Sequence, residues 1–160
     1  MQTNILEYLD YTVKRVPDKI AYSNGETGIS FREVYDQARA IGTFLNRQGV
    51  YKEPVVVFMN RHPKAIVAFY GVVYGGNFYV PIDEEMPRFR IELILKNLNP
   101  RAIICDETTR NIVETFQYDG GIYLYDDIVK TPIDEEVIGR IRQASIDTDP
   151  IYVVFTSGST

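Results

Sequence analysis

The first fifty residues alternate between helical and strand spacing of apolar positions. A helical stripe near the start ends at Pro17, because proline cannot continue a helix. The members of this stripe are Ile5, Leu9, Val13 and Val16. Two short segments, 20–23 and 28–31, flank a polar Asn-Gly turn and predict a small hairpin. Ser30 and Glu33 then fit a capping box, which predicts the start of a second amphipathic helix.

Beyond residue 50, short continuous apolar runs alternate with helical segments. Runs of this kind are typical of strands that are covered on both faces. Five parallel strands in one sheet are predicted, at Val55–Met59, Phe78–Val80, Ala102–Cys105, Ile122–Tyr125 and Ile151–Phe155. Pro63 and Pro87 stand where first-turn prolines open helices. The repeated strand–helix–strand unit predicts an α/β fold, a doubly wound and mostly parallel sheet with helices on both faces.

Two further helices are predicted before the last strand. The apolar positions of these helices are Ile112, Val113 and Phe116 in one, and Val137, Ile138 and Ile141 in the other. The acidic run 134–136 predicts a solvated face. We expect a helix, hairpin and helix over residues 1–50 and the α/β sheet region over residues 51–160.

Composition and charge narrow the class of protein. The 160 residues are 45% hydrophobic and 24% charged, which excludes disorder and a coiled coil. The net charge is −5 and no basic stripe is visible, which weighs against nucleic-acid binding. One Cys and one His exclude a disulfide framework and a zinc site built from this chain alone. The longest apolar stretch, Ala65–Val73, is too short to span a membrane, and no signal peptide is recognisable, so we expect a cytoplasmic protein.

Several reactive residue types have structural explanations. Cys105 ends an apolar run without a basic neighbour, which predicts a buried structural thiol. His62 precedes Pro63 and is expected to be a surface or capping group. Arg61 and Asp83 lie at strand ends, where function concentrates, yet structural hydrogen bonding explains both.

The last five residues, Thr156-Ser157-Gly158-Ser159-Thr160, follow the last predicted strand. Glycine allows close backbone approach, and amide and hydroxyl groups donate hydrogen bonds to anionic oxygens, so such a loop can cradle phosphate. Ligands of doubly wound sheets bind beyond the carboxyl ends of the strands. The same composition is also typical of an ordinary turn. The loop is neither a Walker loop nor a nucleophile elbow.

Four segments, taken together, resemble adenylate-forming enzymes. They are Ser30–Val34, Gly71–Asp83, Pro87–Pro100 and Asp149–Thr160, the last being similar to the start of the family's phosphate-loop signature. Pro81-Ile82-Asp83 is most similar to amino-acid adenylation domains of non-ribosomal peptide synthetases and to D-alanine–carrier-protein ligases. Acyl-CoA synthetases more often have Asn in place of Asp83. This sequence departs from the family where Tyr74-Gly75 replaces the usual Lys-Ala, and where Met86 replaces a common Tyr.

The resemblance implies a ligase chemistry with ATP and Mg²⁺. Such enzymes join an amino acid or another carboxylate to AMP, release pyrophosphate, and pass the acyl group to the phosphopantetheine thiol of a carrier protein. On matching positions, the ATP phosphates would contact Thr156, Ser157, Gly158, Ser159 and Thr160. The Thr156 or Ser157 hydroxyl would be the direct donor. No catalytic residue and no metal ligand is assigned within the chain.

The family's adenine pocket, acid pocket and catalytic Lys follow the part that this chain resembles. We therefore expect residues 1–160 to be a partial AMP-binding domain, the first subdomain of the large N-terminal domain, and inactive alone. An acyl-CoA synthetase fragment is one alternative, which differs in the acid and the acceptor. A non-catalytic α/β binding module is the other. Truncation would also expose apolar surface, which predicts self-association.

Overall fold

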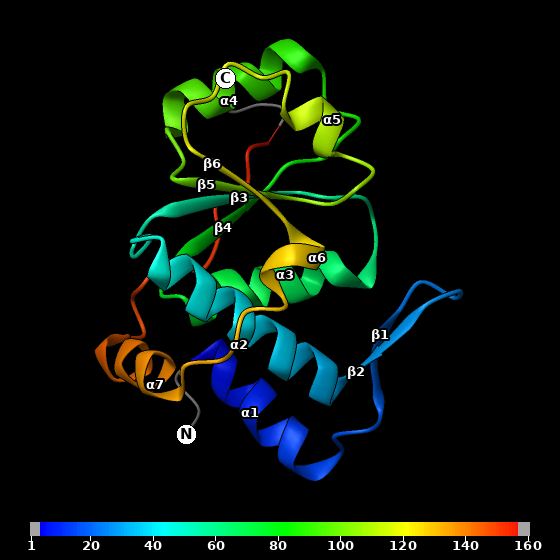
Figure 1. Ribbon diagram of the computed structural model, residues 1–160, viewed down its shortest axis with the longest axis vertical. Helices are drawn as coiled ribbons and strands as arrows, with labels where there is room; N and C mark the ends of the chain where they lie inside the picture. Colours follow the sequence, from blue (N-terminus) through cyan, green and yellow to red (C-terminus); the bar gives the residue numbers. More distant parts are fainter. Residues whose placement is uncertain (1–3, 157–160) are drawn as a thin grey trace.

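A four-stranded parallel sheet lies at the centre of the molecule, in the order β4-β3-β5-β6 (Figure 1). The computed structural model describes residues 4–156. The strands are β3 (Pro54–Phe58), β4 (Phe78–Pro81), β5 (Ala102–Cys105) and β6 (Gly121–Leu124). In the register of the sheet, Val56 of β3 pairs with Val80 on one side and Ile103 on the other. The expected α/β architecture with a parallel sheet is confirmed.

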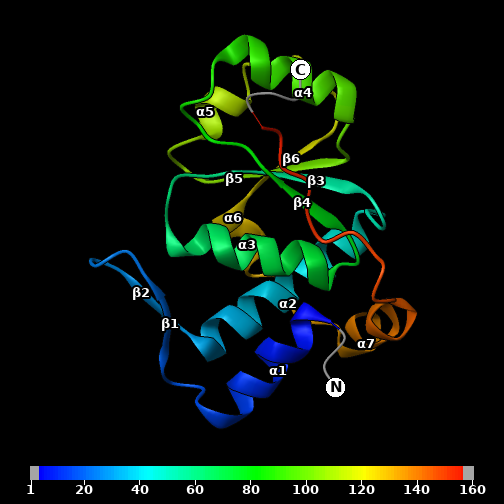
Figure 2. The same ribbon diagram turned by 180° about the vertical axis from the view of Figure 1, so that it is seen from behind.

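Helices cover both faces of this sheet, as predicted (Figures 1 and 2). The helices are α1 (Ile5–Arg15), α2 (Phe31–Arg47), α3 (Pro63–Tyr74), α4 (Arg88–Leu98), α5 (Arg110–Val113), α6 (Tyr125–Ile128) and α7 (Glu135–Ala144). Helices α4 and α5 cover one face, and α3, α2 and α6 cover the other. Helices α1 and α7 pack against α2 and α3 from outside. The chain therefore forms a sheet with one helical layer on one side and two on the other.

Close packing of α2 on α3 explains why α3 is apolar almost all round. Helix α3 lies between the sheet and α2, so both of its faces are covered. At Gly71, an added Cβ would lie only 2.6 Å from the Cβ of Ile41 in α2. The two helix backbones can approach this closely because Gly71 has no side chain.

The hairpin and the helix start after it are also confirmed. Strands β1 (Ile20–Ser23) and β2 (Gly28–Ser30) pair antiparallel and project from the body of the molecule (Figure 1). The Glu33 amide donates to the Ser30 hydroxyl at 3.2 Å, and the Ser30 amide donates to the Glu33 carboxylate at 2.7 Å. This reciprocal pair satisfies two free donors at the start of α2.

The predicted fifth strand is wrong in its extent. Residues 151–155 run parallel to β4, but only Tyr79 and Tyr152 form a bridge. The Tyr79 amide donates to the Ile151 carbonyl and the Val153 amide to the Tyr79 carbonyl, each at 3.0 Å. The next residue of β4 whose backbone groups face residues 151–155 is Pro81, which has no N–H to donate. The ladder therefore stops after two hydrogen bonds.

Two other boundaries differ from the prediction. Strand β6 ends at Leu124, and Tyr125 opens the short helix α6 instead of closing the strand. The Tyr125 hydroxyl donates to the Gln37 side chain of α2 at 2.6 Å, which ties this turn to the helical layer. Helix α5 ends at Val113, so Phe116 lies beyond it, where it packs edge to face on Phe58.

Candidate functional site

The carboxyl ends of β3, β4 and β5 meet at one edge of the sheet, and the loops that follow them carry the candidate residues. The chain leaves β3 toward α3 on one face and β5 toward α5 on the other. This reversal makes the β3/β5 junction the topological switch point, where ligands of doubly wound sheets bind.

Hydrogen bonds close the switch point between β3 and β5. The Asn60 amide donates to the Asp106 carboxylate at 2.8 Å, and the buried Thr109 hydroxyl donates to the Phe58 carbonyl at 2.6 Å. Burial disfavours the charged form of Asp106. The hydrogen bonds that it accepts from Thr108, Asn60 and Thr109 outweigh this effect and lower its pKa. The junction is thus filled by protein groups.

The open space at this edge lies one strand away, between β3, β4 and the segment 153–156. A cavity of about 630 Å³ is lined mainly by apolar side chains, among them Phe69, Ile82 and Phe155. Its polar rim includes Arg61, whose guanidinium donates to the Asp83 carboxylate at 3.1 Å. The Glu85 amide and then Arg61 lower the pKa of Asp83. Arg61 and Asp83 therefore form an exposed hydrogen-bonded pair, which agrees with the structural hydrogen bonding expected of each, although their pairing with each other was not predicted.

His62 and Cys105 also have structural roles, as predicted. His62 caps α3, because its Nδ1 accepts a hydrogen bond from the Lys64 amide at 3.1 Å. Burial raises the pKa of the Cys105 thiol to about 11, with a further contribution from Asp106. The thiol is therefore protonated at neutral pH, and a thiolate nucleophile is disfavoured.

The segment that leads to the hydroxyl-rich loop runs along the open side of β4 (Figure 2). Phe69, Tyr79 and Tyr152 stack in sequence, with ring centroids 4.4 Å and 5.8 Å apart. At the end of the segment, Arg90 of α4 donates to the Thr156 carbonyl. The structure thus brings Thr156 beside the cavity and a cation. Ser157, Gly158, Ser159 and Thr160 lie outside the described residues, so their contact with phosphate stays a prediction.

Arg90 also lies at this edge of the sheet. It belongs to the Arg90-Ile91 pair of the segment Pro87–Pro100, which resembles adenylate-forming enzymes, but no role in the site was predicted for it from the sequence. It follows Pro87 at the start of α4, and its Nη2 reaches the segment that enters the predicted loop. A guanidinium is a suitable group for anionic oxygens. The sequence signal was the Arg-Ile pair of the matched helix, but its contact with Thr156 joins residues 66 positions apart.

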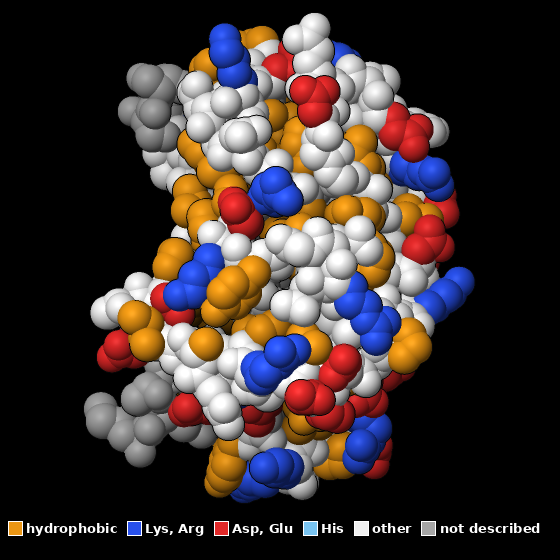
Figure 3. Space-filling model, turned by 60° about the vertical axis from the view of Figure 1, so that its left-hand side comes forward, with side chains coloured by type: hydrophobic (Ala, Val, Ile, Leu, Met, Phe, Trp, Pro, Cys, Tyr) orange, Lys and Arg blue, Asp and Glu red, His pale blue; other side chains and the backbone are white. Residues whose placement is uncertain are grey.

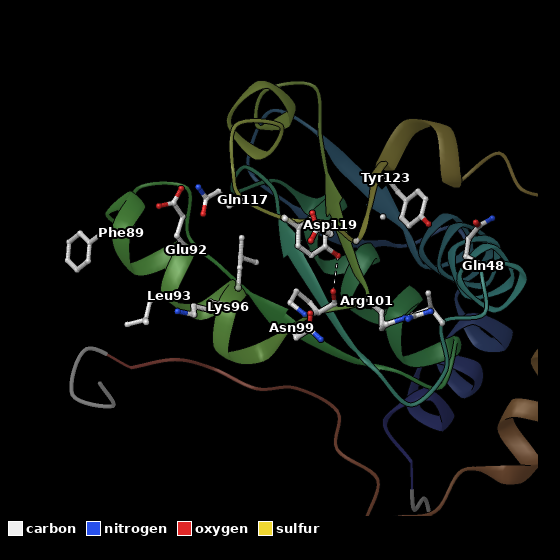
Figure 4. A pocket seen from close by; sticks show the side chains of 16 residues that line it. Gln48, Phe89, Glu92, Leu93, Lys96, Asn99, Arg101, Gln117, Asp119 and Tyr123 are labelled. Carbon is white, nitrogen blue, oxygen red and sulfur yellow. Dashed lines mark hydrogen bonds between the residues drawn. The ribbon is translucent and has the colours of Figure 1, made fainter.

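A larger groove, of about 790 Å³, lies at the opposite end of the sheet (Figure 4). Its lining includes Lys96 of α4, Arg101 before β5 and Asp119 before β6. Figure 4 shows that the charged side chains are spread along the groove. Tyr118 donates to the Pro100 carbonyl across the groove at 2.9 Å. This arrangement offers no convergent set of groups, so we place the candidate site at the carboxyl ends.

The described residues do not by themselves fit a divalent metal ion. Residues 4–156 contain no group of three or more His, Cys, Asp or Glu side chains placed to hold one.

Within the same residues, no helix combines the length and apolar character that a membrane crossing requires. Lys and Arg side chains are interspersed with Asp and Glu on the face in Figure 3.

Comparisons with known proteins match this chain over its whole length. The model of a family described as AMP-binding enzyme matches residues 9–160. A D-alanine–D-alanyl carrier protein ligase of Listeria monocytogenes is 32% identical over 166 residues, which cover 100% of this chain and 32% of the ligase. Tyrocidine synthase 1 of Brevibacillus parabrevis is 27% identical, over 98% of this chain and 14% of the synthase. The chain thus spans about a third of the length of the ligase that it matches.

Solved structures show the same fold. The nonribosomal peptide synthetase FmoA3, in its alpha-methyl-L-serine-AMP bound form, matches 94% of this chain and 16% of its own with a TM-score of 0.79 at 23% identity. VinN matches 96% of this chain and 42% of its own, with a TM-score of 0.73 at 23% identity. At this identity the likeness shows the fold alone.

Proposed function

The chain belongs to the AMP-binding enzyme family, and on this premise we propose that it is part of an ATP-dependent ligase that activates an amino acid for a carrier protein. The carboxylate attacks the α-phosphorus of ATP, and the bond to pyrophosphate breaks, which leaves an acyl-adenylate. The carrier's phosphopantetheine thiol then displaces AMP. Relatives that are named as carrier protein ligases and peptide synthetases support this choice of substrate and acceptor.

One observation carries the proposal: the segment after Pro150 runs parallel to β4 toward the carboxyl ends of the strands, and the hydroxyl-rich sequence Thr156–Thr160 follows it in the chain. In the proposal, Thr156, Ser157, Gly158, Ser159 and Thr160 contact the ATP phosphates. Amide and hydroxyl donors there would stabilise the charge that develops on the phosphates. Arg90 adds a cation beside Thr156.

The first test is amino-acid-dependent exchange of labelled pyrophosphate into ATP, with the protein that carries this chain. We expect exchange with D-alanine or another amino acid, and little with fatty acids. Thr156→Val and Ser157→Ala should each lower the exchange rate about tenfold or more, as expected for lost transition-state donors. Thr148→Val removes an exposed hydroxyl before the segment and is the matched control. The absence of exchange with every acid, from a folded protein, would contradict the proposal.

The acceptor separates this function from that of an acyl-CoA synthetase. After adenylate formation, a phosphopantetheine-bearing carrier protein should become labelled by the amino acid, whereas free CoA should not. Labelling of CoA alone would instead support the acyl-CoA synthetase. A protein that binds a partner but no ATP would support the non-catalytic module.

The 160-residue chain without further sequence should not form an adenylate, and it should bind ATP no more tightly than in the millimolar range. Ordering a loop for the phosphates costs about 1–2 kcal/mol per residue in backbone entropy. The cavity is lined mainly by apolar groups, which would not offset that cost by binding phosphate. The net charge of −5 adds a weak repulsion of ATP. Calorimetric titration with ATP and Mg²⁺ measures this. Micromolar binding would show that the phosphate site is complete in the chain.

Self-association and a cytoplasmic location are further parts of the proposal. Phe89, Leu93, Tyr152 and Val154 are exposed on α4 and on the terminal segment. Figure 3 shows hydrophobic side chains along the hollowed left-hand margin of the molecule. Exposed apolar surface of this kind favours association. Light scattering of the 160-residue chain should show concentration-dependent dimers, and a strict monomer at high concentration would contradict this part.

A further inference from the structure

A carboxylate of α1 joins three helices far from the candidate site. The Tyr74 hydroxyl, at the end of α3, donates to Asp10 Oδ1 at 2.7 Å. Arg142 of α7 donates to Asp10 Oδ2 through Nη2. Both carboxylate oxygens of Asp10 are therefore engaged, one by α3 and one by α7. Burial, and then the hydrogen bond to Asp10, raises the pKa of Tyr74, so its hydroxyl keeps the proton that it donates.

Helix α7 has few other attachments. Its buried apolar side chains are Val137, Ile138 and Ile141. Near its start, Glu135 pairs with Arg39 of α2. Ile141 packs on the turn that precedes β4, where an added Cβ at Gly76 would lie 3.0 Å from its Cγ2 atom. The position of α7 is therefore set by these apolar contacts, by the hydrogen bond that the Asp134 amide donates to the buried Thr43 hydroxyl of α2 at 3.2 Å, and by two ion pairs.

A short tether connects α7 to the segment beside β4. Residues 145–150 join the end of α7 to Ile151, and a chain of this length spans at most about 20 Å. A turn shortens it further, because the Asp149 amide donates to the Ile146 carbonyl at 3.1 Å and the Ile146 amide to the Asp149 carboxylate at 3.0 Å. The tether is also held by the Lys52–Asp149 ion pair, and the residues to which it leads are joined to β4 by two backbone hydrogen bonds.

We propose that Asp10, Tyr74 and Arg142 are positioning residues: by holding α7, they set where the segment from Ile151 to Thr156 lies along β4. The position of the segment would in turn set the point from which residues 157–160 continue. The first statement stands on contacts of the described residues. Its consequence for ATP rests on the proposed function.

The Tyr74 hydroxyl suits this cluster because it donates a hydrogen bond to Asp10 without adding a charge. A second cation beside Arg142 would compete for Asp10, whereas the phenol is a neutral donor. Arg142 Nη1 is buried and has no hydrogen-bond partner within residues 4–156. Loss of Asp10 would therefore leave the whole guanidinium unpaired, which is costly in a partly buried site.

Amide hydrogen exchange of the 160-residue chain tests the proposal without ATP. We expect Asp10→Asn to speed exchange of the Val153 amide about tenfold or more, and that of the Phe116 amide, which hydrogen-bonds to the Val113 carbonyl on the other side of the sheet, less than about threefold. Tyr74→Phe removes a single hydroxyl and should act in the same direction with a smaller effect. Arg142→Lys should retain part of the protection, because it keeps the charge. The matched control is Glu114→Gln, which breaks the Arg110 pair on α5 and should leave Val153 unchanged.

The outcomes separate positioning from general stabilisation. Equal acceleration at Val153 and Phe116 would show that the cluster only stabilises the whole fold, and would overturn the proposal. An unchanged Val153 amide in Tyr74→Phe and Arg142→Lys would overturn it as well. If Asp10→Asn does not fold, those two milder variants carry the test.

In the protein that carries the chain, Tyr74→Phe should raise the KM for ATP in pyrophosphate exchange more than it lowers kcat. This split is expected of misplaced binding groups rather than of lost chemistry. If that protein shows no exchange at all, the proposed function fails while the Val153 result stands. If exchange is present and Val153 does not respond, only the positioning role fails.

Discussion

The carboxyl ends of the sheet are held in two different ways. Between β3 and β5, the Asp106 carboxylate accepts from the Asn60 amide at 2.8 Å, and the fully buried Thr109 donates to the Phe58 carbonyl at 2.6 Å. On the outer side of β4, the segment from Ile151 is held by two backbone hydrogen bonds, by the hydrogen bond from Arg90 to Thr156, and by the stacking of Tyr152, which is 59% exposed. The two regions lie at the same edge of one sheet and differ in the burial of the groups that hold them.

This difference explains where the cavity lies. A closed switch point fixes the loop after β3, and so it provides a firm wall for the space beside it. The opposite wall of the cavity is formed by the segment from Ile151 to Thr156, which contributes Val154 and Phe155. Regions with few buried contacts open at low free energy, and ligand-binding segments are often of this kind. The weaker wall is the one that leads into the predicted phosphate loop.

Thr109→Val should produce the largest loss of stability. Valine has the same shape but cannot donate to the Phe58 carbonyl or accept from the Asp106 amide. Two buried backbone groups would lose their partner, which costs about 2–4 kcal/mol of unfolding free energy. Chemical denaturation measures this loss. Thr12→Val removes a hydroxyl from the surface of α1 and should cost less than about 0.5 kcal/mol. Equal losses in the two variants would show that the switch point is not specially held.

Asp106→Asn should have a smaller effect that depends on pH. Above about pH 5 the variant should be about 1–2 kcal/mol less stable, because an amide cannot accept from both the Asn60 and Thr109 amides as the carboxylate does. The pKa of Asp106 is lowered in the folded chain. Its contribution is therefore present above the unfolded pKa of about 3.9 and is lost as the pH falls through the folded pKa. The gap between the two denaturation curves should close in acid. A gap that is constant down to about pH 3 would contradict this account.

Arg61→Ala should have the smallest effect on stability, within about 0.5 kcal/mol, because its side chain is 84% exposed. The pKa of Asp83 should rise in this variant. It should stay below its usual value, since the Glu85 amide still donates to the carboxylate at 2.9 Å. Carboxyl carbon chemical shifts followed over pH measure the change. A large loss of stability would show that this exposed pair holds the rim of the cavity together.

Local patterns predicted most of the elements correctly. Apolar periodicity, first-turn prolines and the capping box of Ser30 and Glu33 depend on neighbours within a few residues, so one sequence contains the signal. The short helix at Tyr125 was missed because a strand pattern runs directly into it. The acidic residues Asp126 and Asp127 of its first turn were the available signal.

Long-range contacts could not be predicted in the same way. Residues 134–136 were expected to form a solvated face, yet Asp134 caps α7 and Glu135 pairs with the buried Arg39, 96 positions away. The Glu135 side chain remains 74% exposed, so the solvated face is confirmed there. Its ion pair was not predicted, because the partner is visible only after folding. The fifth strand failed for a similar reason. The apolar run was present, but its pairing depends on the register that places Pro81 on the outer side of β4.

Hydrogen exchange of the unmodified 160-residue chain tests the difference between the two regions most directly. Amides of the central strand β5 should exchange only through global unfolding, whereas the Val153 amide should exchange through local opening, about a hundredfold faster or more. The Asn60 amide, bound to Asp106 at the switch point, should exchange more slowly than Val153. If Val153 is protected as strongly as Ile103 and Asn60, both sides of the site are equally firm and the account is contradicted.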